Sequence, residues 1–334
     1  MPSSPASEVL TFADIESAQE VLKGVAVVTP VLESALLNAA LGFRLRVKAE
    51  PLQITGSFKF RGAYNAISRI PEDRREAGVV AFSSGNHAQG VAAAASMLGL
   101  PSVILMPKDA PKTKVELTRA WGAEVVTFDR FTESREELGA KLREDRDATL
   151  IKPYDDPLIM AGQGTLAAEA VRACAADGWT PDVFISPCGG GGLIAGCSTA
   201  VRALSPETDV YSAEPAGFDD TARSLAAHKR LANDPAARSI CDALLAPEPG
   251  ELTFAVNSER LTGGLSVTDD EALTAMAVAF KYLKLVVEPG GAVALAAAIT
   301  GKLECRGSNV LVVCSGGNAD ADVYARALSR PLPF

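Results

Sequence analysis

The chain has 334 residues, of which 48% are hydrophobic and 22% charged, with a formal net charge of −9 at pH 7. This length and composition fit one large or two ordinary globular domains, and they exclude small disulfide scaffolds and wholesale disorder. The acidic balance argues against broad binding to nucleic acids and to anionic membrane surfaces. The segment from Met1 to Phe12 has no basic residue and no apolar run, so no secretory signal is expected there. We therefore expect a cytoplasmic protein whose partner is a small molecule.

Strand-like and helix-like segments alternate along the chain. Short β-branched or aromatic runs end in Gly, Pro or Ser, and most are followed by a longer segment rich in Ala, Leu or Glu. This alternation predicts an α/β fold whose parallel strands are joined by crossover helices. In chain order the expected elements are strand 79–82, helix 86–98, strand 102–106, helix 112–121, strand 124–128, helix 134–146, strand 183–185, helix 193–204, strand 210–213, helix 272–283 and strand 310–313.

Charge is unevenly distributed over this pattern. The stretch 108–152 is richer in charged residues than the segments on either side, as expected of a smaller, more solvated domain inserted in a larger apolar one. We expect residues 1–76 and 156–334 to form the large domain, and residues 77–155 to form a small mobile α/β domain. The six cysteines include no CxxC pair and lie in or beside apolar sequence, so we expect reduced core thiols.

The segment 55–63 places a lysine between aromatic residues. Lys59 lies between Phe58 and Phe60, and Ser57 precedes them. Apolar surroundings disfavour the ammonium form, so such a lysine can act as a nucleophile or form a Schiff base near neutral pH. The alternative is a surface lysine whose aliphatic stem covers apolar neighbours while its charge stays in water.

A run of four glycines follows the strand 183–185 and opens the helix 193–204. Gly189, Gly190, Gly191 and Gly192 leave backbone N–H groups uncovered at the positive end of a helix dipole. This arrangement is typical of a phosphate site. The alternative is that the glycines serve only a tight turn.

The same run also fits a dinucleotide fingerprint. Gly190-x-Gly192-x-x-Ala195 is followed by Glu214 at the end of the next strand, where an acid that binds a ribose would lie. A nicotinamide-dependent oxidoreductase is therefore an alternative at this point.

Polar residues gather at two further strand ends. Ser83, Ser84, Asn86 and His87 lie where the strand 79–82 meets the helix 86–98, and their hydroxyls and the helix N–H groups could hold a substrate carboxylate. The alternative is a helix N-cap. Ser315 lies in a polar loop after the last apolar strand, which alone predicts only a turn.

Taken together and in this order, the four segments resemble the fold-type II pyridoxal-phosphate enzymes, specifically the branch of serine/threonine ammonia-lyases and serine racemase. The resemblance runs from about Leu22 to Leu328 and includes Tyr154-Asp155-Asp156-Pro157. It implies an α/β fold like that of the tryptophan synthase β-chain, with two open, twisted, mostly parallel sheets flanked by helices. It also implies pyridoxal 5′-phosphate as cofactor and a homodimer.

The resemblance assigns roles to the residues of the four segments. It implies that Lys59 binds the cofactor covalently and that Ser315 meets the pyridine nitrogen. The other cofactor contacts that it implies are Phe58, Asn86 at the ring hydroxyl, and Gly189, Gly190, Gly191 and Gly192 at the phosphate. The substrate contacts that it implies are Ser57, Ser83, Ser84, Asn86, His87 and Arg135.

The reaction implied is β-elimination from a β-hydroxy amino acid with release of ammonia, and the competing substrates are 3-hydroxyaspartate and threonine or serine. Ser84 matches the second acid/base of the racemases, so serine racemase is the alternative within the family. Arg135 matches a position that faces a second carboxylate in relatives, although a surface ion pair would explain it equally well. A ligand-binding sensor that reuses the fold is the non-enzymatic alternative.

The segment 214–220 resembles the divalent-cation loop of the same family. The implied ligands are the carboxylates of Glu214 and Asp220 and the carbonyl of Phe218, a set of oxygens that suits Mg²⁺, with Ca²⁺ or Mn²⁺ as alternatives. A solvated acidic turn would give the same pattern. Ala243 departs from the family, whose members commonly carry glycine at this place beside the cofactor ring.

Overall fold

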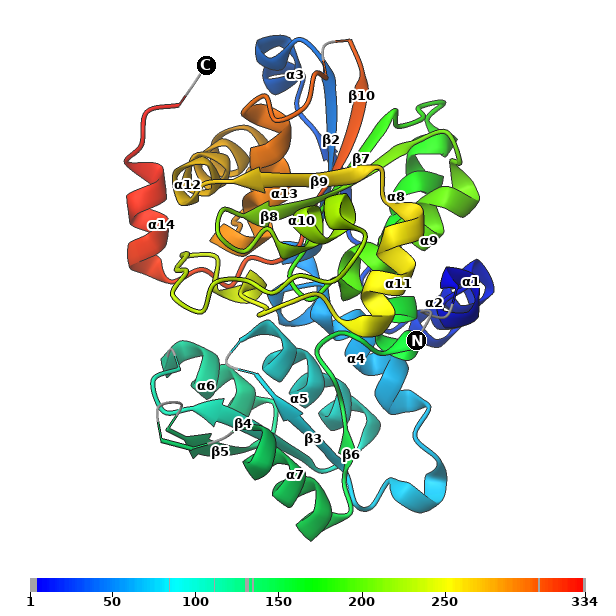
Figure 1. Ribbon diagram of the computed structural model, residues 1–334, viewed down its shortest axis with the longest axis vertical. Helices are drawn as coiled ribbons and strands as arrows, with labels where there is room; N and C mark the ends of the chain where they lie inside the picture. The colour runs from blue at the N-terminus through cyan, green and yellow to red at the C-terminus, as the bar shows by residue number, and fades with distance from the viewer. Residues whose placement is uncertain are drawn as a thin grey trace.

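The computed structural model describes residues 5–332 apart from positions 84, 111, 130, 131, 134 and 306, and apart from the side chains at 113, 135 and 136. Its larger sheet has six strands in the order β1-β2-β10-β7-β8-β9, and only β1 runs antiparallel to its neighbour (Figure 1). In that order the strands are Val31–Glu33, Arg44–Ala49, Asn309–Cys314, Val183–Pro187, Asp209–Pro215 and Gly263–Val267.

The smaller sheet has four parallel strands in the order β5-β4-β3-β6. These strands are Glu124–Phe128, Ser102–Pro107, Val79–Phe82 and Thr149–Leu150. All of them fall within residues 79–150, and Figure 1 shows them below the larger sheet. The α/β class with two mostly parallel sheets is therefore confirmed, while the domain boundaries stay a prediction.

Helices follow most strands, as the alternation predicts. The α-helices are α1 (Ala6–Val9), α2 (Phe12–Leu22), α3 (Ala35–Leu41), α4 (Lys59–Ser68), α5 (Asn86–Leu98), α6 (Lys112–Ala120), α7 (Arg135–Arg146), α8 (Pro157–Ala176), α9 (Gly192–Leu204), α10 (Asp220–Ala227), α11 (Glu251–Arg260), α12 (Asp269–Val278), α13 (Pro289–Ile299) and α14 (Ala321–Leu328). Short 3-10 helices are η1 (Glu50–Leu52), η2 (Ile54–Gly56), η3 (Glu72–Arg74) and η4 (Asp242–Leu244).

The helix expected over 272–283 differs from the structure. Helix α12 begins three residues earlier, because Thr268 and Glu271 form a capping box. It then passes into a π-helical turn, η5 (Ala279–Leu283), which ends at Lys284 in the left-handed conformation. Among the described residues, no helix combines the length and the apolar character that crossing a membrane requires.

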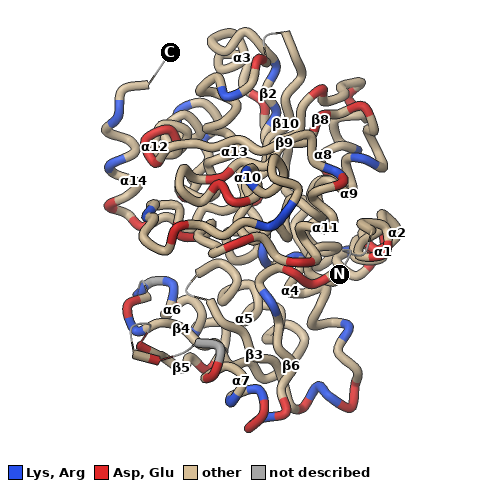
Figure 2. The backbone as a smooth tube through the Cα atoms, in the orientation of Figure 1, with Lys and Arg blue, Asp and Glu red and all other residues tan. Residues whose placement is uncertain are grey.

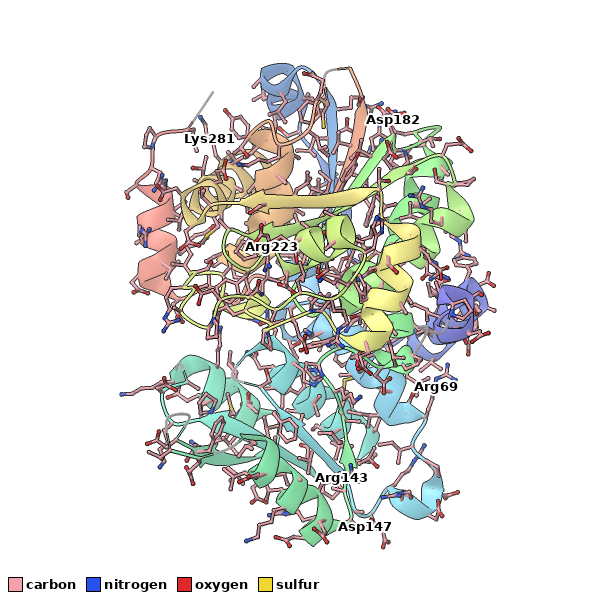
Figure 3. All side chains as sticks on the ribbon, viewed as in Figure 1. Arg69, Arg143, Asp147, Asp182, Arg223 and Lys281 are labelled. Atoms are coloured by element: carbon pink, nitrogen blue, oxygen red, sulfur yellow. The ribbon has the colours of Figure 1, made fainter. Side chains whose placement is uncertain are left out.

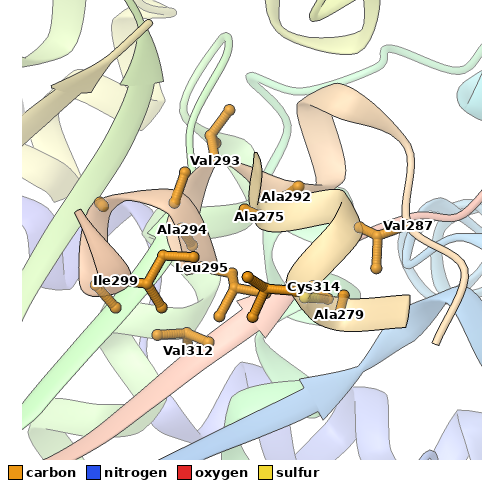
Figure 4. Packing of buried hydrophobic residues seen from close by; sticks show 14 of the residues in the cluster. Ala275, Ala279, Val287, Ala292, Val293, Ala294, Leu295, Ile299, Val312 and Cys314 are labelled. Atoms are coloured by element: carbon orange, nitrogen blue, oxygen red, sulfur yellow. The ribbon is translucent and has the colours of Figure 1, made fainter. Parts of the chain in front are cut away.

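The core of the larger sheet is built on α13. Every residue of this helix is buried, and it packs on β10, β7 and β8 as well as on α12. Figure 4 shows Leu295 of the helix beside Val312 and Cys314 of β10. Small alanine side chains let this helix lie close to the strands. Its sequence is apolar all round because the helix is buried on every face. The six cysteines are all buried, as expected of core positions, and none is paired with another.

Glycines bring three helices into backbone contact. A Cβ atom on Gly162 of α8 would lie 2.6 Å from the Cα of Gly62 in α4. A Cβ atom on Gly196 of α9 would lie 2.2 Å from the carbonyl oxygen of Met160 in α8. Any larger residue would force these helices apart. The N-terminal ends of α4 and α9, where the candidate site residues lie, are therefore fixed to one support.

Candidate active site

Lys59 is the first residue of α4, and the turn before it is tied to the loop after β10. Ser57 forms an isolated antiparallel bridge with Gly316. The N–H of Phe58 donates to the carbonyl oxygen of Ser315 at 3.0 Å. Two of the four predicted segments, far apart in sequence, are thus joined by backbone contacts.

The Lys59 side chain is partly buried and points inward. Its Nζ donates to the carbonyl oxygen of Pro153 at 2.7 Å and lies 5.2 Å from the centre of the Phe58 ring. Burial lowers the pKa of Lys59 to about 8. A surface lysine with its charge in water does not fit this arrangement, and part of the amine is unprotonated near neutral pH.

The glycine run connects β7 to α9. Gly191 has a φ of 93°, a left-handed conformation that favours glycine, and Gly192 begins the helix of 13 residues. The carbonyl oxygens of the run are engaged: Thr253 Oγ1 donates to that of Gly190 at 2.7 Å, and Asn257 Nδ2 to that of Gly191 at 3.3 Å. No described residue accepts a hydrogen bond from the N–H of Gly190 or Gly192.

The ring of Tyr154 covers this loop. A Cβ atom on Gly190 would lie 2.4 Å from the Tyr154 ring, so only glycine permits the contact. Tyr154 directly follows Pro153, whose carbonyl accepts the hydrogen bond from Lys59. Free N–H groups at a helix N-terminus can donate to a phosphate, and the nearby Lys59 amine, part of which is unprotonated, can react with the carbonyl of a cofactor.

Asn86, the first residue of α5, belongs to a buried polar cluster. Its Nδ2 donates to Glu288 Oε1, and its Oδ1 accepts from Asn318 Nδ2 at 2.8 Å. Burial and the nearby charge of Asp242 raise the pKa of Glu288 to about 7. Sequence reasoning missed Glu288. The signal was present, since Glu288 is an acid placed directly before the apolar helix α13.

Lys114 forms an ion pair beside this cluster, between a helix that packs on the smaller sheet and a segment of the larger one. Its Nζ lies 2.6 Å from Asp242 Oδ2, which joins α6 to η4, and only 7% of the Lys114 side chain is exposed. Although burial opposes it, the charge of Asp242 raises the pKa of Lys114. A Cβ atom on Gly85 would lie 3.6 Å from the same Nζ, so the ammonium group flanks the polar turn before α5.

The predicted substrate residues lie around this turn. Ser83 Oγ accepts from the N–H of Gly85 at 3.1 Å, and Ser57 Oγ is buried without a described partner. His87 is buried, and its Nε2 lies 3.0 Å from the carbonyl oxygen of Ile151. Burial and the charge of Lys59 lower the pKa of His87 to about 3, so the ring is neutral and Nε2 carries the proton that this carbonyl accepts.

Two predicted site residues are not described in full. Ser84 lies outside the described residues, and Arg135 begins α7 with its side chain outside them.

Ser315 lies in the site with an unbonded hydroxyl. It is 5% exposed, its N–H donates to the carbonyl oxygen of Gly291 at 3.2 Å, and no described residue bonds to its hydroxyl. The hydroxyls of Ser57 and Ser315 are therefore free to meet a bound molecule.

The residues of the predicted cation loop lie together beside β8. Glu214 is fully buried, and its oxygens accept from the N–H groups of Thr221 and Ala222 at 2.9 and 2.8 Å. Asp220 Oδ1 accepts from Asn233 at 2.6 Å, whereas its Oδ2 has no described partner. This burial does not fit a solvated turn, and the bonds of Glu214 do not fit a ribose ligand.

Burial disfavours the charged forms of the two carboxyl groups at this loop. Burial and the charge of Asp220 raise the pKa of Glu214 to about 8, and burial raises that of Asp220 to about 6. Among the described residues, no group of three or more His, Cys, Asp or Glu is arranged to bind a metal. A cation here would need backbone carbonyls such as that of Phe218, and such a mixed oxygen set suits Mg²⁺ or Ca²⁺.

A buried ion network supports α4 from behind. Arg61 is fully buried and donates to both oxygens of Glu50, at 2.8 and 2.9 Å, and to both of Glu169, at 2.7 and 2.9 Å. Lys48 Nζ adds a contact of 2.6 Å to Glu169, and Thr29 Oγ1 donates to Glu50 at 2.5 Å. The first turn of α4, which carries Lys59, is thereby tied to η1, directly after β2, and to α8.

The chain is similar in sequence to a known enzyme family and to individual enzymes. Residues 23–316 match the model of the family described as pyridoxal-phosphate dependent enzyme. An L-threo-3-hydroxyaspartate ammonia-lyase of a Pseudomonas species is 43% identical, over 95% of this chain and 98% of that protein. A serine racemase of Schizosaccharomyces pombe is 37% identical, over 96% of this chain and 98% of that protein.

A solved structure agrees with the arrangement of the two sheets. The maize serine racemase has a TM-score of 0.89 and 35% identity to this chain. The match covers 96% of this chain and 97% of that one. The similarity therefore extends over nearly the whole of both chains.

Proposed function

The chain belongs to the family of pyridoxal-phosphate-dependent enzymes, within which it is an ammonia-lyase, and we propose that its preferred substrate is a 3-hydroxyaspartate. The reaction is β-elimination from a β-hydroxy amino acid, which gives a 2-oxo or imino acid and, on hydrolysis, ammonia. One observation carries the choice of substrate: the relative named for L-threo-3-hydroxyaspartate is 43% identical, over 98% of its own length. Threonine and serine are the competing substrates.

The residues around Lys59 fit pyridoxal phosphate. The free N–H groups of Gly190 and Gly192 would hold its phosphate, Lys59 would bind it covalently, and the unbonded hydroxyl of Ser315 would donate to its ring nitrogen. Asn86 and Phe58 would complete the contacts with the ring. When bound, this cofactor stabilises negative charge at the α-carbon of an attached amino acid.

The chain's own groups supply proton transfer and binding. With a pKa of about 8, the Lys59 amine can accept the α-proton of the substrate near neutral pH. A serine hydroxyl at position 315 donates to an unprotonated nitrogen, whereas a carboxylate there would keep it protonated. The hydroxyls of Ser57 and Ser83, with the N–H groups at the start of α5, would bind the substrate carboxylate.

Hydride trapping tests the assignment of Lys59. Sodium borohydride should fix the cofactor on the peptide that contains Lys59, and mass spectrometry of a digest should locate it. The Lys59→Ala variant should carry no adduct and release no ammonia. An adduct on another lysine would contradict the proposal. Wild-type protein that holds the cofactor but has no turnover would favour the ligand-binding sensor.

Substrate choice is tested by ammonia release from the four 3-hydroxyaspartate stereoisomers, L-threonine and L-serine. We propose that Arg135 binds the second carboxylate. Arg135→Ala should therefore lower kcat/KM for the best 3-hydroxyaspartate by about tenfold or more, because a charge-assisted hydrogen bond is lost. Threonine, which has no second carboxylate, should be little affected. Lys141→Ala, on the same helix, is the control, and equal losses on all substrates would remove Arg135 from the specificity argument.

We also propose a divalent cation, Mg²⁺ in the first place, at Glu214, Asp220 and the carbonyl of Phe218. The buried Asp220 Oδ2 without a partner supports this proposal. Thorough chelation should lower the melting temperature, and Mg²⁺ should restore it in the wild type but not in Asp220→Asn. A melting temperature that chelation leaves unchanged would contradict the site.

Three further properties stay predictions from the sequence. We propose a homodimer, which analytical ultracentrifugation tests, and a cytoplasmic location, which cell fractionation tests. Racemisation of serine depends on Ser84 as the second acid/base. The Ser84→Ala variant should lose D-serine formation while it keeps ammonia release.

A further inference from the structure

A cavity of about 510 Å³ lies where the smaller sheet joins the rest of the molecule. Its walls come from the end of α4, from η3, α7 and β6, and from the start of α8. The floor is apolar and includes the buried residues Ile70, Ile151 and Ile159. A volume of this size is typical of small-molecule sites and too small for a folded partner.

Basic side chains line the cavity. Arg69, Arg74, Arg143 and Lys152 belong to the lining, against a single acid, Asp156. The Asp156 carboxylate accepts from the first N–H groups of α8, so its charge is already used to cap that helix. Figure 2 shows acidic and basic segments interspersed over the chain. In a protein of net charge −9, a cavity with four cations and one anion is therefore distinctive.

Most of these cations have no carboxylate partner among the described residues. Arg74 pairs with Asp147 at 3.2 Å. Arg69 donates to the neutral side chains of Asn65 and Ser17, and Lys152 only to the carbonyl oxygen of Asp155 at 3.5 Å. Figure 3 shows Arg69, Arg143 and Asp147 on the part of the molecule that surrounds β6.

Arg143 is the most available of the four cations. Its side chain lies at the exposed edge of the cavity on α7, and no described residue forms a hydrogen bond or an ion pair with it. An apolar floor with unneutralised cations above it is complementary to a small organic anion that has an apolar body.

One wall of the cavity is shared with the candidate active site. Ile151 and Lys152 line the cavity, and Pro153 follows them directly. On the other side of this segment, the carbonyl oxygen of Ile151 accepts from His87, and that of Pro153 accepts from Lys59. A molecule that displaces residues 151–153 would therefore act on two hydrogen bonds of the candidate site.

We propose that this cavity is a regulatory binding site for a small organic phosphate or carboxylate with an apolar body. The anionic group pairs with Arg143 and its basic neighbours, and the body covers the apolar floor. Binding shifts residues 151–153 and so changes the position and the reactivity of Lys59. The binding step does not depend on the proposed substrate, whereas the regulatory step rests on the proposed ammonia-lyase activity.

The binding step is tested with phenyl phosphate as the probe, titrated calorimetrically into the cofactor-loaded enzyme. Binding should be tighter than that of benzoate, which has one negative charge fewer, and much tighter than that of inorganic phosphate or phenol. Arg143→Gln should weaken the binding of phenyl phosphate by about tenfold. Lys141→Gln removes the same charge from the same helix outside the cavity and should leave binding unchanged.

Three outcomes would overturn the binding proposal. They are absence of binding by phenyl phosphate and benzoate, equal weakening in the Arg143 and Lys141 variants, and binding by phenol as tight as by phenyl phosphate. Absence of binding together with a change of oligomeric state in Arg143→Gln would show instead that this face is an interface between copies of the chain.

The regulatory step is tested by ammonia release at saturating phenyl phosphate. The wild-type kcat/KM should change by about twofold or more, and this change should vanish in Arg143→Gln at the same probe concentration. Binding without any effect on kcat/KM would overturn the regulatory role and leave the binding site intact. A protein that binds the probe but releases no ammonia from any amino acid would overturn the ammonia-lyase assignment instead.

Discussion

Replacement of Arg61 by methionine is the sharpest test of how α4 is held. Methionine keeps much of the side-chain volume but has no charge and no donor. It would remove both hydrogen bonds to Glu50 and both to Glu169, and it would leave Glu50 fully buried with Thr29 as its one remaining side-chain donor. The perturbation is therefore the creation of a poorly compensated buried charge.

The expected loss of stability follows from burial. Breaking a buried ion pair on one side typically costs about 3–5 kcal/mol. Burial alone would raise the pKa of Glu50, but the charge and hydrogen bonds of Arg61 outweigh it and lower that pKa below 4.5. The stabilising effect is thus present above the unfolded pKa and is lost as the pH falls through the lower folded value. The difference between wild type and variant should shrink in acid, where Glu50 is protonated.

The assay is urea denaturation followed by circular dichroism and fluorescence at neutral pH and near pH 4. Arg44→Met is the matched control, because the Arg44 side chain is 51% exposed and its pair with Glu33 should contribute only about 0–1 kcal/mol. The double variant Arg61→Met with Glu50→Gln should recover part of the loss. If Arg61→Met is no less stable than Arg44→Met, or if the loss does not depend on pH, the reasoning is refuted.

Three further predictions concern the site and its support. The rate of covalent uptake of pyridoxal phosphate by the cofactor-free protein should rise with pH and level off above about 8, because only the unprotonated Lys59 amine attacks the aldehyde. Stopped-flow absorbance measures this rate, and a rate independent of pH would contradict the prediction. Gly196→Ala should lower the free energy of unfolding by about 1–3 kcal/mol, since its Cβ would meet the Met160 carbonyl at 2.2 Å; an unchanged urea midpoint would show that α8 and α9 separate easily. Asp242→Asn removes the charged partner of Lys114 and should speed hydrogen exchange in α6; equal exchange in both proteins would mean that the pair does not hold the two units together.

Much of the fold is visible in the sequence because local patterns set it. The strands expected at 79–82 and 124–128 coincide with β3 and β5, since each is a β-branched run bounded by turn residues. The two-residue strand β6 was missed, because so short a segment has no period of its own and is defined only by its pairing with β3. The π-helical end of α12 was missed for a related reason, since periodicity alone continues the helix.

The site was predictable as far as each segment carries its own signal. The glycine run by itself indicates a phosphate site. The lysine between phenylalanines by itself leaves a surface lysine open, and its chemistry is indicated only when the four segments are taken together. The contact between Lys114 and Asp242 could not be read in this way, because the two residues are 128 positions apart and each lies in an ordinary charged or turn-like context. Glu288 was missed because the following Pro289 and Gly290 suggest a simple turn. The roles of the predicted contact residues stay predictions.

The glycine contacts among α4, α8 and α9 have a consequence for how a cofactor would be carried. The amine that would tether it stands at the head of one helix, and the amides that would grip its other end stand at the head of another. These two helices are clamped through a third by contacts too close to admit a methyl group. The distance between the Lys59 amine and the amides of the glycine run is therefore fixed by helix packing. The entrance to the site can open or close without changing that distance.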